Sequence, residues 1–125
     1  MKVSKRDFVK GAAAVVAAAA QVAHALPRMA TNAPFDLIVF NDLFPQARSF
    51  AAGHSGPGAR ALPIAGDPGR LWYGTLRSLV TDGHRRIAGL TTHTDLLILE
   101  TLARDKGLRV SQREFAGRLV SWVLS

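Results

Sequence analysis

The sequence contains no cysteine among its 125 residues. This absence excludes a disulfide, a thiolate nucleophile, and a zinc or iron–sulfur centre held by cysteine. A domain of this size without cross-links must bury a substantial apolar core to be stable. The chain has the residues for one, in the apolar runs Leu37–Phe40, Leu96–Leu99 and Leu119–Leu124.

Basic residues are not concentrated enough to indicate a nucleic-acid partner. The whole chain has 16 Lys+Arg against 9 Asp+Glu. Positions 1–25 hold four of the basic residues and one of the acidic ones, which leaves 12 against 8, a net charge of +4, for residues 26–125. Arg85-Arg86 is the only adjacent basic pair in that part. A nucleic acid or an acidic membrane surface needs a dense basic face, so we expect neither as a partner.

Fingerprints of cofactors and of common catalytic sites are also missing. The glycine-rich loop Gly53–Gly58 follows a predicted helix and lacks the Gly-Lys-Ser/Thr ending of a P-loop. No Gly-x-Ser-x-Gly elbow of a serine hydrolase is present. His54, His84 and His93 do not have the i and i+4 spacing of a helical metal site. We therefore expect no cofactor and no dedicated metal site.

The first 25 residues have the organisation of a cleavable export signal. A basic head precedes an alanine-rich middle, and Ala23-His24-Ala25 offers the small residues that a signal peptidase requires. The middle spans about fifteen residues, whereas a spanning helix needs roughly 20 strongly apolar ones, so no permanent membrane anchor is expected. Cleavage is predicted after Ala25, with Ala33 as a second choice. The alternative is an ordinary N-terminal helix of a cytoplasmic protein.

The basic head resembles a twin-arginine export signal. That motif has a serine, a basic pair, any residue, a phenylalanine, an aliphatic residue and a lysine, and here it is carried by Ser4, Lys5, Arg6, Phe8 and Lys10. Lys5 stands where the first arginine usually lies. The resemblance implies that the twin-arginine translocase exports the folded protein to the bacterial periplasm or beyond, and that signal peptidase removes residues 1–25.

After a leader over residues 26–34, residues 35–125 are predicted to form one small α/β domain. The patterns predict helices over 44–52, 68–82 and 93–106 and strands over 35–40, 59–65, 86–90, 108–115 and 119–124. The order β-α-β-α-β-α-β-β indicates three layers, with a mostly parallel sheet between helices. Residues 119–124 are predicted as a closing antiparallel strand, and a terminal amphipathic helix over 118–125 is the alternative.

Local signals mark where the helices begin. Pro45 suits the first turn of a helix, where its missing N–H is not needed. Asp67 can cap a helix that starts at Pro68, and Thr92 with Asp95 has the spacing of a capping box.

Polar residues follow the first three predicted strands. They are Asn41-Asp42, Gly66-Asp67 and Thr91-Thr92-His93. Because ligands of open α/β sheets bind beyond the carboxyl ends of the strands, we predict a site there for a small acidic metabolite. Its candidate ligand-binding residues are Asp42, Asp67, Thr91, Thr92 and His93. Helix capping, strand termination and surface exposure explain the same residues without a ligand.

Three functions are compatible with this sequence. The first is a non-catalytic accessory or binding protein that holds a partner protein, a second copy or a small anionic ligand. The second is a small lyase, isomerase or hydrolase, in which His93 acts as general acid or base and Asp42 orients it or acts as the base. The third is a degenerate or truncated relative of a larger α/β enzyme that folds only in an oligomer. A cavity containing both Asp42 and His93 favours the enzyme, and an exposed apolar patch favours the binding protein.

Overall fold

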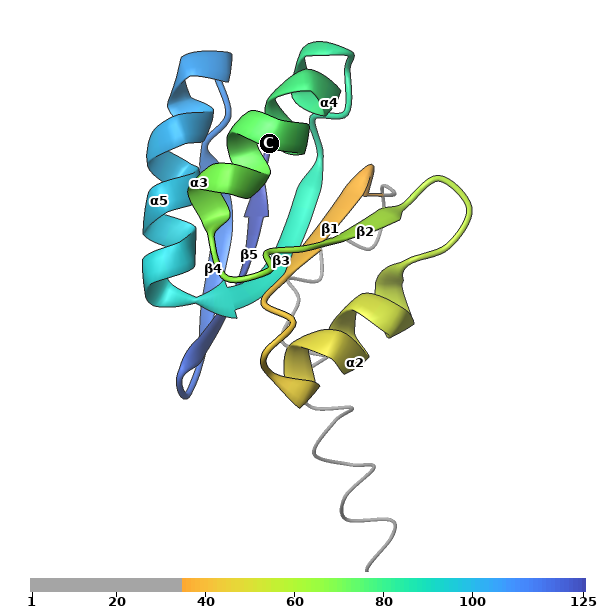
Figure 1. Ribbon diagram of the computed structural model, residues 1–125, viewed down its shortest axis with the longest axis vertical. Helices are drawn as coiled ribbons and strands as arrows, with labels where there is room; N and C mark the ends of the chain where they lie inside the picture. The colour runs from red at the N-terminus through yellow and green to blue at the C-terminus, as the bar shows by residue number, and fades with distance from the viewer. Residues whose placement is uncertain (1–34) are drawn as a thin grey trace, which may run out of the picture.

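The computed structural model describes residues 35–125, so the expected export signal and leader lie outside the described residues. These residues form one five-stranded sheet, in the order β2-β1-β3-β5-β4, with helices on both faces (Figure 1). The α/β class is therefore confirmed. The strands are β1 (Leu37–Phe40), β2 (Arg60–Pro63), β3 (Ile87–Thr92), β4 (Val110–Ala116) and β5 (Leu119–Leu124).

The predicted element order β-α-β-α-β-α-β-β is not matched, because the structure has additional helical segments. The segment between β2 and β3 is not one regular helix, because a π-helical stretch, η2, separates its two α-helical ends. A short 3-10 turn, η3, also follows the last helix. The segments are α2 (Pro45–His54), α3 (Pro68–Leu71), η2 (Trp72–Leu76), α4 (Arg77–Thr81), α5 (His93–Ala103) and η3 (Arg104–Lys106).

The helices begin where the local signals predict. Pro45 occupies the first turn of α2. The Asp67 carboxylate accepts a hydrogen bond from the Arg70 N–H at 3.2 Å and so caps α3. Thr92 and Asp95 form the predicted capping box at the start of α5.

The sheet is mixed, so the prediction of a mostly parallel sheet is wrong. β1 pairs in parallel with β2 and β3, whereas β5 pairs antiparallel with both β3 and β4 in longer ladders. β5 has inserted between β3 and β4, two strands that run in the same direction. All six residues of β5 are buried, whereas β4 carries Ser111, Gln112, Arg113 and Glu114. Burial of the more apolar strand therefore places β5 inside the sheet and β4 at its edge. The prediction that 119–124 is an antiparallel strand is confirmed.

Two apolar cores lie on opposite faces of the sheet. One lies under α2 and includes Ile38, Phe50 and Leu90. The other lies under α5 and the α3–η2–α4 segment, and includes Trp72 and Trp122. This three-layer arrangement is visible in Figure 1, where α2 stands apart from the other helices. None of the helices within residues 35–125 is long and apolar enough to cross a membrane.

Gly89 allows the largest core side chain to lie flat on the sheet. Gly89 pairs with Trp122 across β3 and β5, and a Cβ at position 89 would lie 2.1 Å from the indole ring. Trp122 is fully buried, and its Nε1 donates a hydrogen bond to Thr91 Oγ1 at 2.9 Å. Glycine inside a strand often marks such a close approach.

Candidate functional site

The chain leaves the carboxyl ends of β1 and β3 toward opposite faces of the sheet. β1 leads into α2 on one face, and β3 leads into α5 on the other. The two strands are parallel neighbours, and the Asn41 N–H just beyond β1 donates to the Leu90 carbonyl at 3.1 Å. Such a divergence is where open α/β sheets usually form a ligand crevice.

On the α5 side of this divergence, side chains of the protein fill the space and bond to one another. Asn41 Nδ2 donates to Asp95 Oδ2 at 2.8 Å, and the Thr92 N–H donates to the same oxygen at 3.2 Å. The Asp95 N–H donates in turn to Thr92 Oγ1 at 3.2 Å. Asn41 and Asp95 are both buried. Thr92 therefore has its hydroxyl engaged in the cap, and Asn41 bridges the two diverging connections.

Thr91 lies inside β3 and not in the corner after it, because the strand continues two residues beyond its predicted end at Leu90. Its side chain is fully buried, and its hydroxyl donates to the Thr92 carbonyl at 3.0 Å while accepting from Trp122. The Thr91 hydroxyl is thus part of the core below α5.

Asp42 and Asp67 are both engaged in local structure. Asp42 Oδ1 accepts from the Ala65 N–H at 2.9 Å, which links the ends of β1 and β2, and Ala65 has a φ of 55°. The Asp42 main-chain carbonyl also accepts from Arg48 Nη1 at 2.8 Å. Asp67 caps α3. The structure accounts for both carboxylates without a ligand, and their ligand role stays a prediction.

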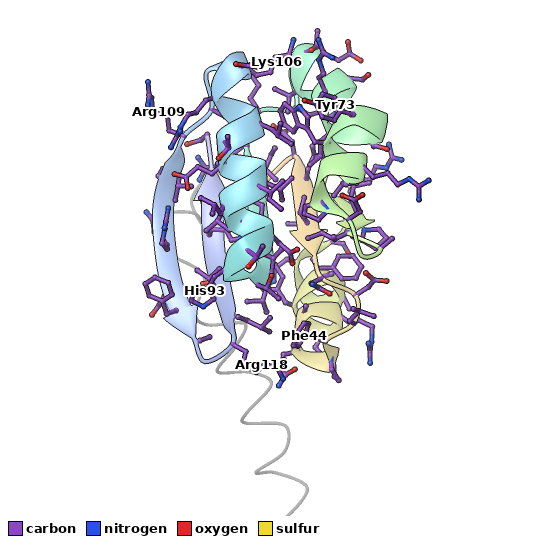
Figure 2. The ribbon with its side chains drawn as sticks, turned by 60° about the vertical axis from the view of Figure 1, so that its left-hand side comes forward. Phe44, Tyr73, His93, Lys106, Arg109 and Arg118 are labelled. Atoms are coloured by element: carbon purple, nitrogen blue, oxygen red, sulfur yellow. The ribbon has the colours of Figure 1, made fainter. Side chains whose placement is uncertain are left out.

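The structure does not bring the two candidate catalytic residues together. His93 stacks on Phe115 of β4, with ring centroids 5.0 Å apart and planes 15° from parallel. Asp42, by contrast, accepts a hydrogen bond from Ala65, which follows β2. β2 and β4 are the strands at opposite edges of the sheet. The small cavity that His93 lines, of about 50 Å³, does not include Asp42. Figure 2 shows His93 beside β4 and away from α2.

An exposed apolar surface surrounds His93. Phe115 is 63% exposed and Leu97 is 62% exposed, and both line the same small cavity as His93. We call these three residues the α5–β4 patch. Arg113 and Glu100 form an ion pair of 3.3 Å beside it. The sequence held a signal for this patch, because four consecutive apolar residues, Leu96–Leu99, cannot all face the core from one helix.

A larger cavity lies on the other face of the sheet, between the start of α2 and the β4–β5 turn. It has a volume of about 400 Å³ and is lined by Phe44, Gln46, Ala116, Gly117, Arg118 and Leu119. The Arg118 guanidinium lies 5.5 Å from the centre of the Phe44 ring. No sequence motif indicates this cavity, because Phe44 and Arg118 are far apart along the chain.

No protein-family model, curated protein or solved structure gives a significant match to this chain. Its function is therefore inferred from its own residues and their geometry.

Proposed function

We propose that this protein is an exported, non-catalytic binding protein of the bacterial periplasm, and that the α5–β4 patch holds a partner protein. The observation that carries this proposal is the pair of exposed side chains, Phe115 and Leu97, beside the edge strand β4. The small-enzyme alternative has no comparable support, because Asp42 and His93 are engaged at different places on the sheet.

The patch has the composition of a small docking surface. Single exposed apolar side chains are ordinary, but adjoining ones bordered by polar groups are typical of a protein–protein contact. Here Leu97 from α5 and Phe115 from β4 line one cavity, with the His93 ring stacked on Phe115. The Arg113–Glu100 ion pair supplies a polar border. The patch therefore has an aromatic anchor and a rim.

The occupant we propose is an extended segment of the partner that adds to the sheet. β4 is the outermost strand on its side, and no other strand within residues 35–125 pairs with its outer edge. The ladder between β4 and β5 shifts register between Val110 and Gln112, whereas Arg113–Ala116 is regular. Because a bulge interrupts pairing, the segment is expected beside Arg113–Ala116, next to Phe115.

Site-specific photo-cross-linking of the full chain in its native cells tests this docking surface. A photoreactive phenylalanine analogue is placed at position 115 or, as a control, at position 73. Tyr73 is a suitable control because it is also aromatic and is 64% exposed, but it lies on η2. We expect a discrete cross-linked protein from position 115 and none from position 73. The same products from both positions, or none from position 115, would contradict the proposal.

The export part of the proposal is supported by the resemblance of residues 4–10 to a twin-arginine signal. A reporter protein fused to the chain tests it. Replacing Lys5 and Arg6 with glutamine removes the basic pair and should block export. Lys2→Gln is the control, since it removes one charge outside the motif and should leave export unchanged. Export of the Lys5→Gln, Arg6→Gln variant at the original rate would show that the twin-arginine route is not used.

A further inference from the structure

We propose that the cavity between α2 and the β4–β5 turn is a binding site for a small carboxylate that carries an aromatic or branched apolar group. We call it the Phe44–Arg118 cavity. In this site Phe44 and Leu119 contact the apolar group of the ligand, and Arg118 and Gln46 bind its carboxylate. Arg118 is the only charged residue that this site uses to bind the carboxylate.

The location of the cavity is one that α/β sheets use for ligands. The Phe44 N–H donates to the Asn41 carbonyl at 3.1 Å, so Phe44 lies directly beyond the carboxyl end of β1. Leu119 pairs with Thr92, the last residue of β3, so the β4–β5 turn lies at the same edge of the sheet. The cavity thus occupies the α2 side of the place where the connections diverge, while Asn41 and Asp95 close the α5 side.

The shape of the cavity suits a small organic molecule. Its volume of about 400 Å³ falls within the range of roughly 300–1,000 Å³ that is usual for small-molecule sites. Leu119 is buried and belongs to the core under α2, and Phe44 packs against that core from its edge. One wall of the cavity is therefore apolar and fixed by the fold. A ligand needs an apolar group to pack against this wall.

The polar groups of the cavity are available to a ligand. Within residues 35–125, no side-chain hydrogen bond or ion pair engages the Arg118 guanidinium or the Gln46 amide, and the guanidinium lies over the Phe44 ring. A guanidinium that lies over an aromatic face keeps its N–H groups free to bind a carboxylate in two-point geometry. Arg118 follows Gly117, whose φ of 63° allows a two-residue turn that holds the arginine close to α2.

This site shares no residue with the α5–β4 patch. The cavity adjoins Leu119, which belongs to the core under α2, whereas Phe115 pairs with Val120, which belongs to the core under α5. Figure 2 shows Phe44 and Arg118 together at the end of the molecule and His93 apart from them beside β4. The tests at Arg118 and at position 115 change different side chains, so the two proposals can fail separately.

Isothermal titration of the full chain tests the site with three probes. They are phenylacetate, its neutral analogue phenylacetamide, and inorganic phosphate. We expect phenylacetate to bind, and the other two to bind at least about tenfold more weakly, because each lacks either the charge or the apolar group. Arg118→Gln should weaken phenylacetate binding by at least about tenfold and leave phenylacetamide binding unchanged.

Two further variants make the outcome decisive. Arg70→Gln removes another exposed arginine, from α3, and should leave phenylacetate binding unchanged. Arg118→Lys keeps the charge but not the planar donor pair, and should bind phenylacetate with intermediate affinity. Circular dichroism confirms that each variant is folded. The proposal is overturned if phenylacetate does not bind at millimolar concentration, if phosphate binds equally well, or if the two arginine-to-glutamine variants have equal effects.

Discussion

Replacing Gly89 with alanine should destabilise the protein by about 2–4 kcal/mol, because the new methyl group would overlap the Trp122 indole. An ideal Cβ at position 89 would lie 2.1 Å from Cζ2, 2.3 Å from Cε2 and 2.6 Å from Cη2 of that ring. Carbon atoms in contact are normally about 3.5–4.0 Å apart. The ring or the strand must therefore move by about 1.5 Å.

The surroundings of Trp122 resist such a movement. The indole is 0% exposed and lies in the larger core, and its Nε1 is 2.9 Å from Thr91 Oγ1. A displacement of this size breaks that hydrogen bond, at a net cost of about 1 kcal/mol. Overpacking of the core adds about 1–3 kcal/mol. The two contributions together give the expected range.

Urea unfolding of the full chain, followed by circular dichroism, measures this change. Gly53→Ala is the matched control, because a Cβ at position 53 in α2 meets nothing within 4 Å. That control should be stabilised by up to about 1 kcal/mol, since alanine favours helices more than glycine does. Combining Gly89→Ala with Trp122→Leu should cost less than the sum of the single changes, because the smaller side chain removes the overlap. A Gly89→Ala protein as stable as the original would refute the pairing of Gly89 with Trp122.

Two further substitutions test the hydrogen bonds near the carboxyl ends of β1 and β3. Thr91→Val keeps the side-chain shape but leaves the buried Trp122 Nε1–H without its acceptor, so urea unfolding should show a loss of about 1–3 kcal/mol, and Thr91→Ser should restore most of it. Asn41→Ala removes the buried donor to Asp95 and should cost about 1–3 kcal/mol by the same assay, whereas an unchanged midpoint would show that this bridge does not hold β1 to α5.

Helix starts were predictable from the sequence because they depend on neighbouring residues. A carboxylate or hydroxyl that can reach the N–H two or three residues ahead caps a helix in most contexts, and Asp67 and Thr92 do so here. Pro45 likewise fits a first turn because its own geometry suits that position. These features involve a few consecutive residues, so the sequence alone specifies them.

Strand order was not predictable in the same way. The alternation of strands and helices predicted a mostly parallel sheet, and in such a sheet the place beside β3 is taken by a strand parallel to it. In the structure β5 takes that place, because it alone can be buried along its whole length. This outcome depends on a comparison between two strands that compete for one position. The polar run from Ser111 to Glu114 indicates an edge strand, but only when β4 is compared with the more apolar β5.

Several of the predicted site residues are engaged by other groups of the protein, and their ligand role stays a prediction. Asn41, Thr92 and Asp95 bond to one another, and Thr91 bonds to Trp122. Sequence patterns show that polar side chains follow the strands, but they do not show whether those side chains satisfy each other. The larger cavity instead joins Phe44 with Arg118, which lie at opposite ends of the described chain and share no motif.

The two sides of the diverging connections differ in how much open space they leave. On the α5 side, the capping box and the Asn41–Asp95 bridge occupy the space and satisfy the polar groups that face it. On the α2 side, Phe44 stands at the position that Thr92 occupies before α5, and its side chain forms no cap hydrogen bond. A bulky apolar ring there leaves open space against the β4–β5 turn, and Arg118 supplies the charge that this space otherwise lacks. We therefore base the ligand-site proposal on Phe44, which precedes α2, and on the Arg118 guanidinium that lies over its ring, and not on the polar residues that follow the strands.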